Sequence, residues 1–458
     1  MKKYIINIKR LSFFALTLTY CLSITSCEKF LDEKSNDSFV VPQTLQDFQA
    51  ILDNNIVLNQ KSTPSLGESC ADDYYLRDID YETFIDRERN FYKWVKHEYN
   101  FQNDWSICYQ NVYNANICLE GISKIPTTAA NSLLWNNVKG SSLFFRAYNF
   151  LNLIWVFGKA YDETSSNTDK GIVLRLQSDF TLPSVRANVK DSYEQVIKDA
   201  KESILYLPNI PAHVMRPSKT ASYGLLARAY LSMRMYDSAH KYSNLSLQAS
   251  DQLLNFNTDV SINSNVPFTP FNKEIIFYSE INLSWSLIAP AFAKIDTALY
   301  DSYDANDLRK IAFFRSSNGR RFKGSYASSI SILFSGISTN ELFLIRAECA
   351  ARRGNKEDAV NDLNKLLENR WVTGTYSPIT SISFSTEALI SLILKERRKE
   401  LLMRGLRWID IKRLNKEGYG LAPKRYINGV LFDLPPNSDF YAIPLPTDIL
   451  RTTGMPDN

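Results

Sequence analysis

Two segments of the sequence align with each other, and they restrict the fold more than any other feature. The first is LLARAYLSMRMYDSAHKYSNLSL (225–247) and the second is IRAECAARRGNKEDAVNDLNKLL (345–367), at an offset of 120 residues without a gap. Small residues such as Ala227 and Ala347 fall on each other, and small residues at such places let paired helices approach closely, as in tetratricopeptide-type repeats. The alignment therefore predicts two helix–turn–helix units in a mainly α-helical chain.

A long insertion separates the two predicted hairpins, because tandem repeats of this kind recur after roughly 34 residues. Residues 250–335 fill the gap; they are rich in Asn, Ser, Phe and Tyr, and they show one predicted strand, Glu274 to Tyr278. Further irregular stretches are 55–100, 159–189 and 371–384. Since binding residues concentrate on loops held by a rigid frame, we expect ligand contacts in such segments.

Helical periodicity dominates the rest of the chain. Residues 105–125 place apolar side chains at spacings of three and four, which indicates one buried face. Residues 142–158 are apolar nearly all round and predict a central helix, and residues 191–208 predict a helix that closes at Pro208. Three tryptophans on predicted helices are expected in the core: Trp105, Trp155 and Trp408.

The last long predicted helix, 385–405, carries charges within its apolar stripe. Ser385 is the predicted cap and Gly405 the predicted stop. Glu396 and Glu400 share the stripe with apolar residues, an arrangement that fits either a catalytic group or a buried ion-pair network. We interpret these charges as an ion-pair network.

The N-terminus has the pattern of an export signal. Four basic residues precede an apolar stretch from Leu11 to Ile24, which is shorter than the roughly 20 residues that span a bilayer. The following Ile24-Thr25-Ser26-Cys27 resembles a bacterial lipobox, in which the signal is cut before the cysteine and the cysteine is acylated. We therefore expect residues 1–26 to be a lipoprotein signal peptide and Cys27 to be the lipidation site. The alternative is a chance cysteine near an ordinary cleavage site.

Composition excludes several classes of protein. The chain of 458 residues has a net charge of +4, and loss of the four basic residues of the predicted signal would bring it to neutrality. A neutral chain has no electrostatic footprint for nucleic acid. Cys108 and Cys118 would lie about 15 Å apart along one helix and cannot bridge, whereas other disulfide pairings stay open.

The sequence offers little for catalysis. It has three histidines, His97, His213 and His240, with no pair at metal-ligand spacing and no CxxC. Nucleophile-elbow, Walker and dinucleotide motifs are also missing from the sequence. We expect no metal and no cofactor. A glycosidase, however, needs only two well-placed carboxylates, so a helical surface glycoside hydrolase or lyase stays open as an alternative.

Sugar binding requires flat apolar faces beside hydrogen-bonding groups, because pyranose rings stack on aromatic rings and hydroxyls need partners. The irregular segments DDYYLRD (72–78), FYKWVKHEYN (91–100) and NLSWS (282–286) supply both. The alternative for each ring is packing beneath a loop. The predicted ligand-binding residues are Asp73, Tyr74, Tyr75, Arg77, Trp94, Tyr99 and Trp285.

Several motifs, in order over nearly the whole chain, together resemble the SusD/RagB family. They are the lipobox followed by Phe30-Leu31-Asp32, WSICYQNVYNANICLEGI, FFRAYNFLNLIWVFG, the two hairpins, NKEIIF (272–277), KERRKELLMRGLRWIDIKR (395–413) and YAIPLP (441–446). The sequence departs from the family pattern at Arg404, where an acidic residue usually precedes the glycine, which puts the local ion-pair network in doubt.

The resemblance implies a fold and a function. The fold would be a tetratricopeptide-like superhelix of helical hairpins, with a frame at about 105–250 and 339–415 and variable insertions at about 55–100 and 250–335, all within one domain, 27–458. The protein would be a non-catalytic, surface-exposed lipoprotein of the outer membrane. It would bind a nutrient glycan, or sometimes a peptide, and deliver it to a SusC-like TonB-dependent transporter. A peptide-binding repeat scaffold shares this fold.

Overall fold

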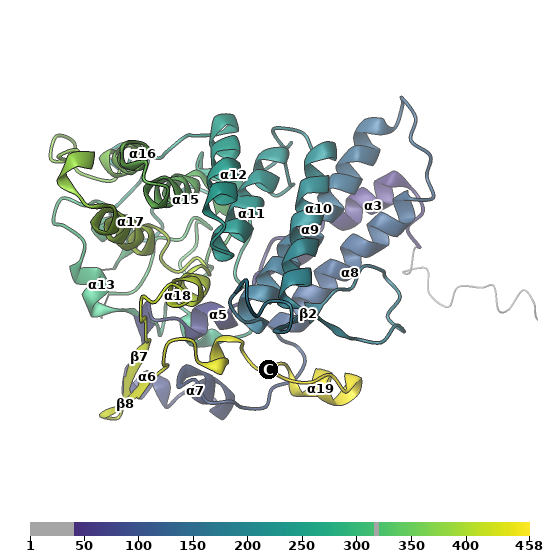
Figure 1. Cartoon of the computed structure of the whole chain (residues 1–458), viewed down its shortest axis with the longest axis horizontal. Coiled ribbons are helices and arrows are strands. Elements are labelled where there is room, and N and C mark those ends of the chain that lie inside the picture. The colour runs from purple at the N-terminus through teal and green to yellow at the C-terminus, as the bar shows by residue number, and fades with distance from the viewer. Residues whose placement is uncertain (1–40, 316–319) are drawn as a thin grey trace, which may run out of the picture. The chain divides into compact units, whose positions relative to one another are not determined.

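The computed structural model describes residues 41–315 and 320–458, and residues 44–458 form one compact unit. Its longer helices are α3 (Leu45–Leu52), α8 (Asp104–Ile122), α9 (Ser132–Phe157), α10 (Val189–Tyr206), α11 (Lys219–Ser232), α12 (Tyr236–Ala249), α15 (Thr339–Arg352), α16 (Lys356–Glu368), α17 (Thr386–Glu400) and α18 (Arg407–Asn415). Shorter helices are α4 (Asn55–Leu58), α5 (Leu66–Cys70), α6 (Asp78–Tyr81), α7 (Asp86–Tyr92), α13 (Thr297–Asp301), α14 (Arg309–Phe313) and α19 (Thr447–Thr453). Figure 1 shows their arrangement.

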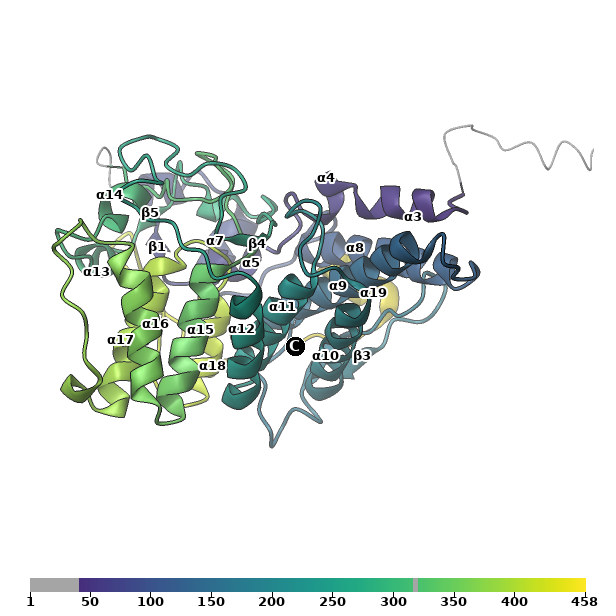
Figure 2. The same cartoon turned by 90° about the horizontal axis from the view of Figure 1, so that it is seen from above.

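The long helices form a continuous array. Each packs against the next in chain order: α8 on α9, α9 on α10, α10 on α11, α11 on α12, α12 on α15, and α15 on α16 and α17. Figure 2 shows α9 to α12 followed by α15 to α17 along this array. The two hairpins predicted from the aligned segments are α11–α12 and α15–α16, and they are neighbours despite the long insertion between them. The predicted mainly α, tetratricopeptide-like architecture is confirmed.

The strands are short and pair in twos. Each pair is antiparallel: β1 (Tyr74–Tyr75) with β5 (Lys294–Ile295), β2 (Lys170–Val173) with β3 (Arg186–Asn188), β4 (Ile275–Phe277) with β6 (Ile337–Ser338), and β7 (Lys424–Ile427) with β8 (Val430–Asp433). The predicted strand 274–278 is β4. Because partners such as β1 and β5 lie more than 200 residues apart in the chain, these pairings tie the irregular segments to one another.

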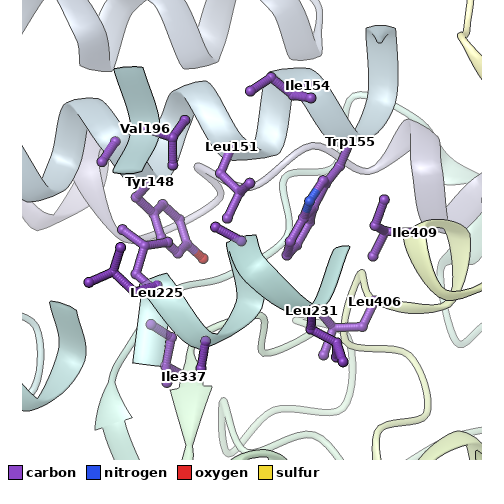
Figure 3. Packing of buried hydrophobic residues seen from close by; sticks show 14 of the residues in the cluster. Tyr148, Leu151, Ile154, Trp155, Val196, Leu225, Leu231, Ile337, Leu406 and Ile409 are labelled. Atoms are coloured by element: carbon purple, nitrogen blue, oxygen red, sulfur yellow. The ribbon is translucent and has the colours of Figure 1, made fainter. Parts of the chain in front are cut away.

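The core is centred on α9, as its nearly continuous apolar sequence predicts. Figure 3 shows Tyr148, Leu151 and Trp155 of α9 facing side chains from α11, from β6 and from the segment around α18. The helix begins ten residues before the predicted start at 142, and its added N-terminal turns are only partly buried. The three tryptophans assigned to the core, Trp105, Trp155 and Trp408, are buried.

The helix predicted at 385–405 ends earlier than expected. The last helical residue of α17 is Glu400 and its C-cap is Leu401, and Met403, with a positive φ of 58°, lies in the turn that follows. Gly405 itself has a φ of 77° and lies in the turn that leads into α18. The predicted stop is therefore a residue of the connection.

The charges of α17 belong to a buried ion-pair network, as the sequence interpretation proposes. Arg309 pairs with Glu396 at 2.6 Å and with Glu400 at 3.0 Å, and Arg370 joins Glu400 at 2.8 Å to Glu274 at 2.7 Å. Burial disfavours a charged Glu400, but the two arginines outweigh it and lower the pKa of Glu400 to about 2. The network holds α17 against the insertion at residues 250–335.

Arg404, the departure from the family pattern, also has partners. Its guanidinium donates to the Ser338 hydroxyl at 2.8 Å and lies 4.0 Å from the ring centroid of Tyr326. The neighbouring ion pairs are intact, so the doubt raised by this residue is removed.

All four cysteines among residues 41–315 and 320–458 are buried free thiols.

Candidate functional site

The seven predicted ligand-binding residues separate into two groups. Five are buried, with 1–7% of their surface exposed: Asp73, Tyr74, Trp94, Tyr99 and Trp285. The other two lie at the surface: Tyr75 is 40% exposed, and the side chain of Arg77 is 50% exposed. Only the second group presents a ring face or a charge to solvent.

The buried tryptophans form part of the packing beneath the surface. The ring of Trp285 lies 4.7 Å from Phe91 and 5.6 Å from Tyr99, and the guanidinium of Arg87 lies 4.7 Å from its centroid. The Trp94 indole donates to the carbonyl of Cys70 at 2.9 Å. The loop-packing alternative describes both rings, because other side chains of the protein already cover them.

Asp73 serves a structural ion-pair cluster with its neighbour Asp72. Arg398 donates to the Asp73 carboxylate at 2.8 Å, and Arg407 donates to Asp72 at 2.6 Å. Burial favours the neutral form of Asp72, but Arg407 and then Arg398 outweigh burial and lower its pKa. These pairs fix the segment before β1 against α17 and α18, so Asp73 positions β1.

Tyr74 and Tyr75 point to opposite faces, as successive strand residues do. The Tyr74 hydroxyl donates to the Ser69 carbonyl at 2.7 Å on the buried side, where Arg425 lies 4.7 Å from its ring. On the other side, Tyr75 is paired across the ladder with Lys294 of β5. We call the exposed Tyr75 and Arg77, the partly exposed Arg321 and the buried Lys294 the Tyr75 surface.

A basin is lined by residues that follow Tyr75 and Arg77 in the sequence, together with residues of the β7–β8 hairpin. It has a volume of about 370 Å³ and lies between α7 and the β7–β8 hairpin. Asn428 of the hairpin donates through its backbone to Asp78 at 2.8 Å and through its side chain to Glu82 at 2.9 Å, so α6 holds the hairpin in place. Figure 1 shows α6, α7, β7 and β8 together. The lining residues are Tyr81, Glu82, Asp86, Arg89, Asn90, Lys93, Ile427, Asn428, Val430 and Phe432.

A second concavity lies along α8. Its volume is about 330 Å³, and its walls are α8, the segment 173–184 and the C-terminal α19. Tyr113 is 43% exposed there and Phe180 is 84% exposed. Arg175 donates to the Ser184 hydroxyl at 2.6 Å, so part of its polar lining is already occupied. This α8 cleft is mostly apolar and aromatic.

The described residues give no sign of a catalytic metal centre. Within residues 41–315 and 320–458, there is no group of three or more His, Cys, Asp or Glu side chains that could hold an ion. In the same ranges, none of the helices has the length and apolar character needed to cross a bilayer. Cys27 and the predicted signal lie outside the described residues.

Sequence reasoning missed several residues of these surfaces. Lys294 lies in the insertion, and its pairing with Tyr75 depends on a contact across more than 200 residues, which no local pattern reveals. The β7–β8 hairpin did have a local signal: Asn428-Gly429 between two apolar-rich runs is the strongest short-range hairpin pattern. Phe180 lies in the irregular segment 159–189, where no local sequence pattern predicts that its ring is exposed.

Comparison with known proteins gives a consistent result along the chain. Residues 29–231 match a family model described as starch-binding associating with outer membrane, and residues 338–448 match a model described as the SusD family. A SusD-like protein of Formosa agariphila is 34% identical over 97 residues, a stretch that covers 20% of this chain and 18% of that protein.

Solved structures share the fold over nearly the whole chain. A SusD superfamily protein from Bacteroides thetaiotaomicron has a TM-score of 0.74 at 21% identity, covering 91% of this chain and 99% of its own. One from Bacteroides fragilis has a TM-score of 0.74 at 19% identity, with the same coverages. A SusD-like carbohydrate binding protein from Bacteroides vulgatus has a TM-score of 0.66 at 18% identity, covering 90% and 97%.

Proposed function

Because the chain belongs to the SusD/RagB family, we propose that it is a surface lipoprotein that binds a nutrient glycan and passes it to a TonB-dependent transporter of the outer membrane. The description of one matching model, starch-binding associating with outer membrane, supports both the ligand class and the location. The carbohydrate binding protein of Bacteroides vulgatus shares the fold. Anchoring would come from acylation at Cys27, and the protein would not cleave its ligand.

The observation that carries glycan binding is the exposed ring of Tyr75 beside charged and polar groups. A ring at the surface can stack on the C–H face of a pyranose, and neighbouring donors and acceptors can take the hydroxyls. Arg77 and Asp80 lie next to it and hydrogen-bond each other at 2.6 and 2.9 Å. The basin of about 370 Å³ would take further sugar units.

The α8 cleft is a second candidate location for the same function. Tyr113 and Phe180 expose ring surface there, which favours stacking. Its lining has two charged side chains, Arg175 and Asp179, whereas the lining of the basin has four, and Arg175 already hydrogen-bonds Ser184. We therefore place the ligand at the Tyr75 surface.

The test compares three tyrosines of nearly equal exposure. Tyr75→Ala, Tyr113→Ala and Tyr419→Ala remove rings that are 40%, 43% and 40% exposed. Tyr419 lies in neither concavity and is the control. Binding of a panel of soluble polysaccharides is measured by isothermal titration, and we expect Tyr75→Ala to weaken binding by roughly 2- to 13-fold, since one stacked ring contributes about 0.5–1.5 kcal/mol.

Each outcome of this comparison has a definite meaning. Weaker binding only in Tyr113→Ala would move the site to the α8 cleft. Failure of the unsubstituted protein to bind any polysaccharide would contradict glycan binding. Shorter products released from the bound polysaccharide would support the hydrolase or lyase alternative, and binding of peptides alone would support the repeat scaffold.

A further inference from the structure

The backbone around Tyr75 brings several positively charged side chains close to its ring. Tyr75 and Lys294 are directly paired residues of an antiparallel ladder, so their side chains lie on the same face. Arg77 follows Tyr75 by two residues through extended backbone, with φ −70° and ψ 151° at Arg77. The backbone N–H of Ile295 donates to the carbonyl of Arg320 at 3.2 Å, which brings Arg321 alongside β5.

The acids near this cluster are already engaged. The Asp80 carboxylate accepts both hydrogen bonds from Arg77, and Asp301 pairs with Arg320 at 3.3 Å. Lys294 and Arg321 form no salt bridge with any residue that the structure describes. The Tyr75 surface therefore has more cations than anions.

Lys294 is the most unusual member of the cluster. Its residue surface is 1% exposed, yet within residues 41–315 and 320–458 its ammonium group has no hydrogen-bond partner, and neither has Nε of Arg321. A buried ammonium without a partner is costly, because it loses water and gains nothing in exchange. Burial, Arg321 and Arg77 lower the pKa of Lys294, and Asp80 opposes them.

We infer that the glycan bound at the Tyr75 surface is anionic, with carboxylate or sulfate groups that pair with Lys294 and Arg321 while a sugar ring stacks on Tyr75. This inference rests on the proposed glycan-binding function. An anion would supply the missing partner of the ammonium, and charge-assisted hydrogen bonds of this kind are about twice as strong as neutral ones.

The anion is assigned to a glycan because of its surroundings. A free inorganic anion has no use for the exposed ring of Tyr75, whereas an acidic sugar unit would occupy the ring and the cations together. The whole chain has a net charge of only +4, so the excess of positive charge at the Tyr75 surface is local. The cluster would therefore discriminate between acidic and neutral glycans.

The experiment uses glycans in matched pairs. Alginate and homogalacturonan are each compared with their carboxyl-reduced forms, and chondroitin sulfate with its desulfated form, its carboxyl-reduced form and the neutral product of both treatments, by isothermal titration with the mature protein at several salt concentrations. We expect the acidic form of the cognate backbone to bind roughly 10- to 150-fold more tightly than its neutralised form, since a hydrogen bond to a charged group is worth about 1.5–3 kcal/mol. Affinity should fall as salt rises.

Two variants locate the anion. Lys294→Met and Arg321→Met should each remove most of the preference for the acidic form, and Lys198→Met on the exposed face of α10 is the matched control. Arg321 is partly exposed, so its variant keeps the test valid if Lys294→Met fails to fold, which circular dichroism would reveal. A preference that survives both substitutions would place the anion elsewhere and contradict the inference.

The glycan pairs separate failure of this inference from failure of the function. Equal or tighter binding of the neutralised forms would overturn an anionic ligand and leave glycan binding intact. Weaker binding after desulfation but not after carboxyl reduction would identify sulfate as the recognised group. Weaker binding after carboxyl reduction but not after desulfation would identify carboxylate. If neither form of any polysaccharide binds, the proposed function itself is wrong.

Discussion

Glu68 shows how the buried surroundings of one residue can decide its charge. It lies in α5 with 1% of its surface exposed; its Oε2 accepts from the backbone N–H of Gly405 at 2.8 Å, and its Oε1 has no partner among the described residues. Burial, followed by the nearby Asp73 carboxylate, raises the pKa of Glu68 to about 8, against the weaker effect of the Gly405 hydrogen bond. At neutral pH this side chain carries a proton that it loses on unfolding.

We therefore predict a pH-dependent effect of Glu68→Gln on stability. A raised pKa in the folded protein gives a contribution that is fully present below about pH 4.5 and is lost as the pH rises through about 8. The amide of glutamine copies the neutral acid and does not titrate, so the variant should gain stability relative to the parent between pH 5 and pH 9. Urea midpoints at pH 5, 7 and 9 measure this gain.

The control for this prediction is Glu163→Gln, an exposed acid whose replacement should leave the difference between variant and parent independent of pH. A constant difference for Glu68→Gln across the same range would show that the acid is charged in the folded protein.

Single residues were the hardest features to predict from the sequence. Trp94 and Tyr75 both lie in aromatic, polar segments, and the pattern around them does not distinguish a packed ring from an exposed one. The difference depends on distant residues: Trp285 lies against Phe91, which is 194 residues away in the chain. Arg77 and Tyr75 are the predicted residues that the fold leaves at the surface.

Helices were far easier to predict, because their periodicity is local. The hairpins α11–α12 and α15–α16 follow from spacing and from small residues, and the centre of α9 follows from its apolar sequence. The long-range strand pairs were beyond reach: β4 pairs with β6 over about 60 residues, and β1 pairs with β5 over more than 200. A pairing between distant segments leaves no periodic pattern in the sequence of either strand alone.

The close approach of the hairpin helices leads to a prediction at this scale. Ala227 of α11 and Ala347 of α15 are completely buried, and α11 and α15 are in contact. Replacing either with Leu forces extra methyl groups into a filled space and should cost about 1–3 kcal/mol. Urea midpoints measure the loss, with Ala388→Leu on the exposed side of α17 as the control. Unchanged midpoints in both buried variants would argue against tight packing at these alanines.

The buried network of α17 gives a larger predicted effect. Arg370→Met would leave Glu400 and Glu274 buried without their shared partner, and breaking such a pair typically costs about 3–5 kcal/mol. The comparison is Arg346→Met, which breaks a partly exposed pair with Asp362 and should cost less. Thermal unfolding of the two variants measures which of them loses more stability. Equal losses of stability in the two variants would mean that burial does not determine how much the Arg370 ion pairs stabilise the fold.

At the scale of the molecule, the long insertion is part of the fold and not an appendage. Its apolar residues form a second cluster, in which Phe256, Phe313 and Tyr326 are almost completely buried. The same cluster includes Tyr74 from β1 and Leu402 from the turn after α17. Because this core draws on three distant parts of the chain, the Tyr75 surface rests on a rigid base, and its geometry should persist when a ligand binds.

The proposed delivery of a ligand to an outer-membrane transporter would require that the protein stay at the membrane, which leads to the last prediction. A single acyl chain holds a protein only marginally, whereas two or more chains hold it firmly, since each buried CH₂ contributes about 0.8 kcal/mol. We expect Cys27→Ala to lose lipid labelling and to leave the outer-membrane fraction, or to stall before cleavage. Cys21→Ala, six residues earlier within the predicted signal, removes a thiol without removing the attachment point and should fractionate like the parent. A Cys27→Ala protein that stays entirely in the outer membrane, with labelling equal to the parent, would mean that the anchor lies elsewhere.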